Sequence, residues 1–146
     1  MQLSMDAILM IHFFVPGVPK TKGSHRAIVR GGHAIVLNDC TTEKPWAEHV
    51  YWTAREAAKE QGWTALDGPM EAWITFHMPR PQRLGKKRTM VLHDRRPDLD
   101  KCLRSVVDAL TGALWNDDAQ VWMIVAVKVY ADFGEPSGVG IKANRT

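Results

Sequence analysis

The sequence predicts an α+β domain in which one mixed β-sheet is covered by about two main helices. Short β-branched and aromatic runs bounded by glycine and proline indicate strands, whereas two longer segments carry apolar residues at helical spacing. The 146 residues are 45% hydrophobic and 24% charged, as expected for a globular chain with one core. We therefore expect a single domain over 1–146, with 1–6 and 134–146 as candidate flexible ends and without internal repeats.

Turn-forming residues separate the predicted strands. The first apolar run, AILMIHFFV, stops at Pro16-Gly17, and residues 26–38 form a hairpin around Gly31-Gly32. VWMIVAVKVYADF is the strongest strand in the chain. Besides the hairpin, we expect strands at 7–15, 68–79 and 121–133, with a short terminal strand at 139–142. Residues 80–96 have no usable periodicity and are predicted to form a flexible loop.

Two segments fit amphipathic helices. The first begins after a cap at Thr41 or Thr42 and continues to about Gly62, with charged residues away from its apolar side. The second, DLDKCLRSVVDALTG, has Asp98 at its N-cap and a stop at Gly112. Its apolar face consists of Leu99, Leu103, Val106 and Leu110.

The basic residues gather in two loop-like segments, although the net charge is only +3. Residues 16–38 contain four Lys/Arg and no acid, and residues 80–96 contain seven Lys/Arg and one acid. This distribution favours a polyanionic partner, while the alternative is two solvated loops that keep the chain soluble.

The cysteines and the N-terminal residues indicate a cytoplasmic protein. Cys40 and Cys102 are too few and too distant for a disulfide scaffold, so a reducing compartment fits. The first apolar run lacks the preceding basic residues of a signal peptide, and no segment is long enough to span a membrane. The spacing of His25, His33, Cys40 and His49 matches no compact zinc site.

Acidic residues flank the second helix at both ends. Asp98 and Asp100 stand at its start, where capping and the helix dipole favour acids, and Asp117 and Asp118 follow its end. A turn back towards the helix start would bring these carboxylates together, and such crowding favours a hard divalent cation. Because basic residues lie alongside, the pattern indicates Mg²⁺ or Mn²⁺ acting on a phosphodiester.

The stretch RPDLDKCLRSVVDALTGALWNDDAQV resembles the signature of the RusA family of Holliday junction resolvases. The upstream stretches FHMP and PGVPKTKGSHR are similar to those of many phage-type members. The resemblance covers roughly Phe13 to Val127. It implies a small, homodimeric, Mg²⁺-dependent endonuclease that cuts four-way DNA junctions, without a nucleotide cofactor or a membrane.

The resemblance also implies roles for individual residues. The family's metal-binding aspartates correspond to Asp98, Asp100 and Asp118, with Asp117 as the adjacent acid. Arg104 stands where the family has a catalytic lysine, and Lys101 replaces the usual asparagine. Arginine keeps the charge and can act as an electrostatic stabiliser, but it cannot release a proton at neutral pH. A reaction that needs proton transfer would therefore be slow or would use Lys101.

Paired cuts on one junction favour a two-fold dimer whose basic loops contact phosphates. The candidate DNA-binding residues are Lys20, Lys22, Arg26, Lys86, Lys87, Arg88, Arg95, Arg96 and Lys101. Trp115 is a further candidate DNA contact, whereas Trp46, Trp73 and Trp122 are expected in the core. Two alternatives stay open, namely a nuclease for flaps or forks and a non-catalytic junction-binding protein.

Overall fold

The structure is a computed structural model that describes residues 8–21, 25–38, 43–86 and 90–146, with the backbone alone described for the two hairpin strands. The predicted α+β class is confirmed, and the elements lie close to the expected ranges. In chain order they are β1 (Met10–Pro16), β2 (His25–Arg30), β3 (His33–Asn38), α1 (Glu43–Gln61), β4 (Met70–Met78), the 3₁₀ turn η1 (Gln82–Leu84), α2 (Leu99–Leu110), the 3₁₀ turn η2 (Asp118–Gln120), β5 (Val121–Tyr130) and β6 (Gly138–Arg145). The proposed caps Thr41 and Thr42 lie outside the described residues.

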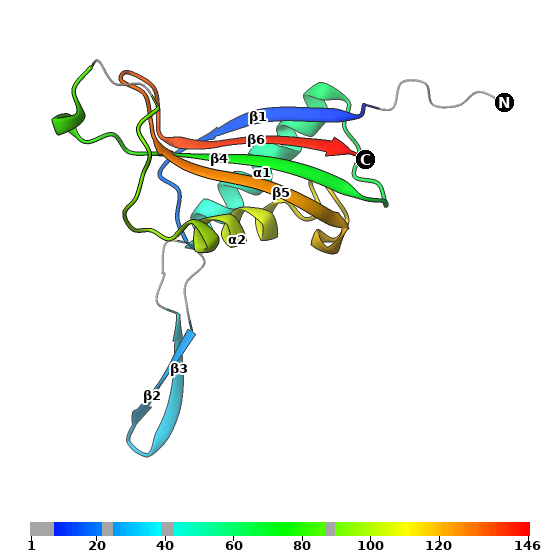
Figure 1. Cartoon of the computed structure of the whole chain (residues 1–146). Helices are drawn as coiled ribbons and strands as arrows, with labels where there is room; N and C mark the ends of the chain where they lie inside the picture. Colours follow the sequence, from blue (N-terminus) through cyan, green and yellow to red (C-terminus); the bar gives the residue numbers. More distant parts are fainter. Residues whose placement is uncertain (1–7, 22–24, 39–42, 87–89) are drawn as a thin grey trace.

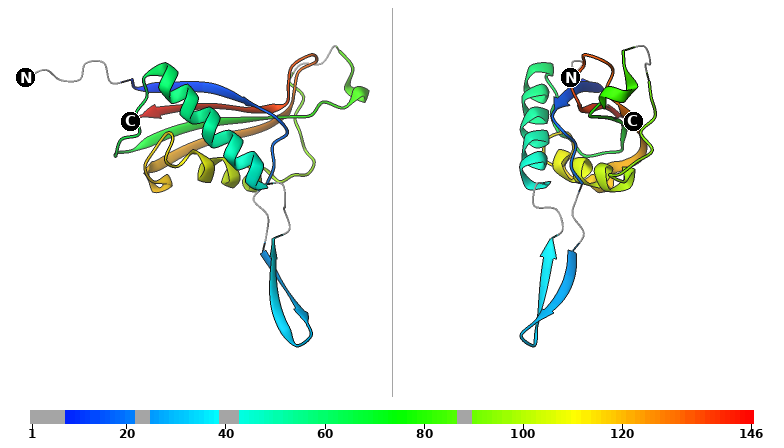
Figure 2. Two further views of the ribbon diagram at one scale, coloured as in Figure 1. Left: turned by 180° about the vertical axis from the view of Figure 1, so that it is seen from behind. Right: turned by 90° about the vertical axis from the view of Figure 1, so that its left-hand side faces the viewer.

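Four strands form one mixed sheet in the order β1-β6-β4-β5 (Figure 1). Strands β4 and β5 are parallel, while β6 is antiparallel to both β1 and β4. Both helices pack on the same face of this sheet, and the opposite face is open (Figure 2). The hairpin β2–β3 extends away from this body, at the end where α2 begins (Figures 1 and 2).

The core lies between the sheet and the two helices. Strand β4 alternates as the period of a half-buried strand requires, with Ala72, Ile74 and Phe76 fully shielded from water. Helix α2 buries Val106 and Leu110 against the same layer. This burial of apolar area is the main favourable contribution to folding, and it fixes α2 beneath β5.

The segment after Gly134 is more ordered than the sequence predicted. Instead of a short terminal strand at 139–142, residues Gly138–Arg145 form an eight-residue strand between β1 and β4. Glycines hid its alternation, because the buried Val139 and Ile141 alternate with Gly138 and Gly140. A Cβ atom at position 138 would lie 2.3 Å from the carbonyl oxygen of Val15, so β1 and β6 approach closely only with glycine there.

The tryptophans do not all lie where the sequence placed them. Trp46 is in the core as predicted, but Trp115 is also fully buried and donates from Nε1 to Thr111 Oγ1 at 3.1 Å. Trp115 is therefore not a DNA contact. The core prediction is wrong for Trp73, which lies on the open sheet face, and for Trp122, whose side chain is 59% exposed.

Within the described residues, none of the helices is both long enough and apolar enough to cross a membrane. Cys102 is a free thiol in the core, and burial raises its pKa to about 11. Cys40 lies outside the described residues.

Candidate active site

The first turn of α2 presents two exposed carboxylates. Asp98 occupies the N-cap, and its carbonyl accepts the first helical hydrogen bond from the Cys102 N–H at 3.1 Å. Its side chain makes no capping hydrogen bond, and its Oδ2 lies 3.9 Å from Lys101 Nζ. Asp100 follows in the first turn and is also exposed. Capping thus explains where the helix starts, but it leaves the Asp98 carboxylate available to a ligand.

The segment that precedes α2 is hydrogen-bonded to the edge of strand β5. The Tyr130 N–H donates to the Val91 carbonyl at 2.8 Å, and the His93 N–H donates to the Lys128 carbonyl at 3.1 Å. A β-bridge between Leu92 and Val129 lies between these bonds. The predicted loop at 80–96 is therefore partly wrong, because it contains η1 and its last part lines the edge of β5.

Lys128 adds a side-chain anchor at the same place. From within β5 its Nζ donates to the carbonyls of Arg95 and Pro97, each at 2.5 Å. Pro97 immediately precedes Asp98, and Arg95 lies two residues before Pro97. Lys128 was not among the residues predicted from the sequence, although a single lysine within an apolar strand was a signal that could have found it.

An open groove of about 670 Å³ lies at the start of α2. It is lined by Leu92, His93, Asp94, Arg95, Arg96, Asp98, Leu99, Val127 and Lys128. The ring of His93 packs on Tyr130 at 4.6 Å, and burial, with the nearby charge of Lys128, lowers its pKa. The groove thus places Asp98, one of the two acids, beside cations able to hold a phosphate backbone.

A second acidic group stands beyond the other end of α2. Asp117 caps η2 by accepting from the Ala119 N–H at 2.9 Å, while Gln120 Oε1 accepts from the Asp117 N–H. The Gln120 amide also donates to the carbonyl of Gly68, which ties the turn to the body. Asp118 is exposed. Asp117 therefore serves the fold, and Asp118 is the better placed of the two for a ligand.

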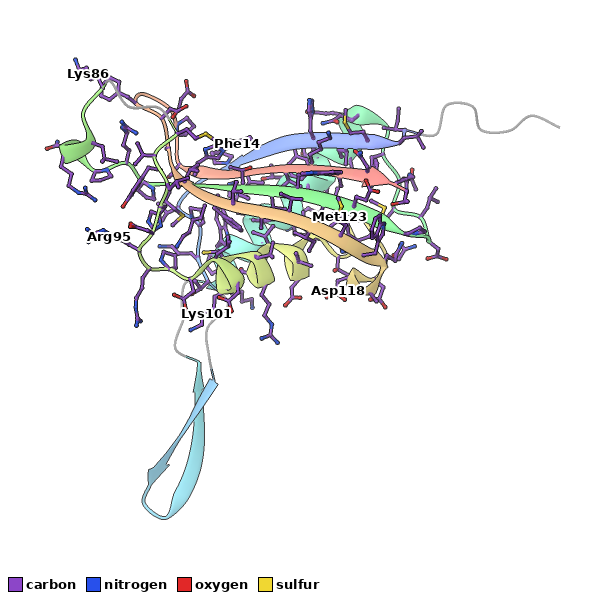
Figure 3. All side chains as sticks on the ribbon, in the orientation of Figure 1. Phe14, Lys86, Arg95, Lys101, Asp118 and Met123 are labelled. Atoms are coloured by element: carbon purple, nitrogen blue, oxygen red, sulfur yellow. The ribbon has the colours of Figure 1, made fainter. Side chains whose placement is uncertain are left out.

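The two acidic groups are far apart within one chain. Lys101 and Asp118 lie at opposite ends of α2 (Figure 3), and twelve helical residues span about 18 Å. Among the described residues, no group of three or more His, Cys, Asp or Glu could hold a metal ion. The expected turn back to Asp98 and Asp100 is wrong, because Leu114 and Trp115 are buried beside the helix end and keep η2 there.

The predicted cations are distributed around the acidic pair. Arg104 is exposed one turn beyond Asp100, and Arg95 and Arg96 are exposed at the groove. Lys86 is exposed at the far end of the loop, where its Nζ lies 5.4 Å from the centre of the Phe133 ring, and Lys20 is partly exposed. Lys22, Lys87 and Arg88 lie outside the described residues, and Arg26 belongs to β2, whose side chains are not described.

The fold and the site define a class of small α+β proteins with an acidic pair beside a cationic groove. The family model of endodeoxyribonuclease RusA matches residues 16–142, so the chain belongs to the RusA endodeoxyribonuclease family. It is also similar to the uncharacterized protein YqaN of Bacillus subtilis strain 168, with 25% identity over 130 residues, or 84% of this chain and 89% of that protein. Family membership supports, in general terms, an endonuclease that resolves Holliday junctions.

Proposed function

We propose that this protein is a Mg²⁺-dependent endonuclease that resolves four-way DNA junctions by paired nicks during recombination and repair, and that it acts as a homodimer. Beyond family membership, the observation that carries the proposal is the pair of exposed carboxylates Asp98 and Asp100 at the start of α2, of which Asp98 lines the cationic groove. A protein that only bound DNA would gain nothing from carboxylates placed beside a phosphate.

The donor chemistry at α2 fits Mg²⁺ or Mn²⁺, because carboxylate oxygens are hard ligands. Asp98 and Asp100 would hold the ion, and Asp118 would complete the set. When bound, such an ion supplies charge neutralisation at the phosphate and a more acidic water. Direct ligands lie within about 2.1 Å of Mg²⁺, whereas Asp118 stands at the far end of an 18 Å helix, so one copy of the chain supplies an incomplete set.

The edge of the sheet offers a way for a second copy to complete the site. Strand β5 is an edge strand, and in the described part of the chain only its last residues are paired on the outer side. Val125 and Val127 are 46% and 42% exposed, and Trp122 is also exposed. An exposed apolar edge of this kind favours pairing with another strand.

The direction of β5 is such that this pairing would bring the two acidic groups of different copies together. Strand β5 begins at η2 and returns to the start of α2, where Lys128 reaches Pro97. Two β5 edges that pair antiparallel about a two-fold axis would set the start of α2 beside η2 of the second copy. Asp118 of that copy would then approach Asp98 and Asp100, and each dimer would carry two sites for two nicks.

The cations would bind and stabilise phosphate. Arg95 and Arg96 line the groove and would position the DNA backbone without reading its sequence. Arg104, one helical turn from Asp100, would stabilise charge that develops on the phosphate. Because arginine does not release its proton, any transfer to the leaving oxygen would come from Lys101 or water.

The test is incubation with a synthetic four-way junction, a flap and a linear duplex, each with Mg²⁺ and with EDTA. We expect Mg²⁺-dependent, symmetric nicks on the junction. Asp100→Asn should abolish nicking while junction binding persists, and Glu60→Gln, a matched change on the exposed surface of α1, should leave nicking unchanged. Normal nicking by Asp100→Asn would refute the metal assignment.

The same assay separates the two alternatives. Preferential cleavage of the flap would identify a nuclease for other branched DNA. A mobility shift of the junction without cleavage by the unaltered protein would identify a junction-binding protein.

A further inference from the structure

We propose that Lys128 is a positioning residue for the metal site, because it holds the backbone that leads into Asp98 and Asp100. The inference rests on the proposed function and deepens it. Lys128 lies on β5, outside the segment that supplies the carboxylates, so it would act through Asp98 and Asp100 and not by binding the ion.

The hydrogen bonds of Lys128 point to this role. Its Nζ donates to the carbonyls of Arg95 and Pro97, and the Pro97 carbonyl belongs to the peptide bond that links Pro97 to Asp98. Hydrogen bonds from a charged donor are shorter and stronger than neutral ones. Two such bonds from a strand of the sheet therefore restrain the backbone position of Arg95 and Pro97, just before α2 begins.

The backbone hydrogen bonds between this segment and β5 do not hold the residues that Lys128 holds. The backbone of β5 binds Val91 and His93, which are anchored without any side chain. Beyond His93, the carbonyls of Arg95 and Pro97 accept hydrogen bonds only from Lys128 among the described residues. Loss of the ammonium would thus free the last residues before Asp98 while leaving the rest of the segment in place.

The position of Lys128 in the sheet is otherwise unfavourable for a charge. It pairs with Phe76, which is fully buried, and it is itself only partly exposed. An ammonium in such a place costs free energy unless acceptors surround it.

Charge and positioning predict opposite effects on metal binding. Removing a positive charge near the carboxylates should by itself tighten the binding of a divalent cation. Losing the anchor should weaken binding, because the ligands must then be ordered when the ion binds. The sign of the change therefore distinguishes the two roles.

The experiment measures Mn²⁺ binding to the full chain by electron paramagnetic resonance, without DNA. We compare the unaltered protein with Lys128→Met, Lys128→Arg and Asp100→Asn. Lys142→Met is the matched control, since Lys142 is an exposed lysine of β6 that lies over Trp73 on the open face. We expect Lys128→Met to bind Mn²⁺ at least about tenfold more weakly, as for other residues that orient metal ligands. Lys128→Arg should recover part of the loss, and Lys142→Met should bind normally.

Equal or tighter Mn²⁺ binding by Lys128→Met overturns the inference. If Lys128→Met does not fold, Lys128→Gln takes its place with the same expectation of weaker binding. Asp100→Asn distinguishes an error in the proposed metal site from an error in the role of Lys128. If it binds Mn²⁺ normally, the metal site of the proposed function is wrong. If Asp100→Asn weakens binding and Lys128→Met does not, only the role of Lys128 is wrong.

Discussion

Mixing two inactive variants should restore nicking if the acidic set is shared between two copies of the chain. Asp100→Asn removes a ligand at the start of α2, and Asp118→Asn removes one at η2. Each variant alone should fail to nick a four-way junction. In a mixed dimer, one site combines both defects, but the other combines intact Asp98 and Asp100 from one copy with intact Asp118 from the other.

The expected recovery follows from the geometry. The length of α2, about 18 Å, exceeds a metal–oxygen distance of about 2.1 Å by so much that Asp118, at the far end, cannot join Asp98 and Asp100 within one chain. After free exchange of equal amounts, about half of the dimers are mixed, and each has one intact site of two. Nicking should therefore return to about a quarter of the unaltered level, as single nicks on denaturing gels.

Subunit exchange is the necessary control. Native mass spectrometry of variants with different tags should detect mixed dimers, and Val125→Lys at the apolar edge of β5 should prevent both the dimer and the recovery. Mixed dimers without any nicking would refute a shared site. Full activity of Asp118→Asn alone would refute the role of Asp118.

Two further predictions concern stability and the buried thiol. Trp115→Ala should lower the free energy of unfolding by about 3–5 kcal/mol in urea titrations, because it leaves a cavity at a fully buried position. Trp52→Ala, at an exposed position of α1, should change the free energy of unfolding by less than about 1 kcal/mol. Equal effects of the two substitutions would contradict the burial of Trp115. Because burial raises the pKa of the Cys102 thiol from 9.0 to about 11, its contribution to stability is complete below pH 9 and is lost as the pH rises towards 11. We therefore expect the unaltered protein to lose stability relative to Cys102→Ala over this range, and a constant difference would contradict the shift.

Local sequence patterns predicted the elements well where periodicity was strong. The apolar face of α2 and the alternation in β4 identified those segments directly, and Asp98 marked the helix start. The same reasoning failed for β6, because glycine contributes no apolar signal at alternate positions. It also failed for Trp115, since burial of an aromatic side chain beside an acidic turn depends on tertiary packing.

The site was predicted by residue type but not by arrangement. Acidic residues on either side of α2 indicated a divalent cation, yet nothing in the sequence gave the distance between Asp100 and Asp118 in one chain. That distance follows from helix length together with the buried turn after α2. Lys128 escaped notice because its acceptors are backbone carbonyls some thirty residues away, which no side-chain motif encodes.

The strand order has a consequence for how the protein is made. Among the described residues, strand β1 joins the sheet through β6 alone, so it becomes part of the sheet only when a strand far along the chain pairs with it. Pairing over so long a stretch of chain is slow, and a polypeptide still being synthesised lacks the strand that completes it. Strands β4 and β5 and helix α2, which carry the proposed site, precede β6, so the complete four-stranded sheet that supports them forms only after β6 has been synthesised.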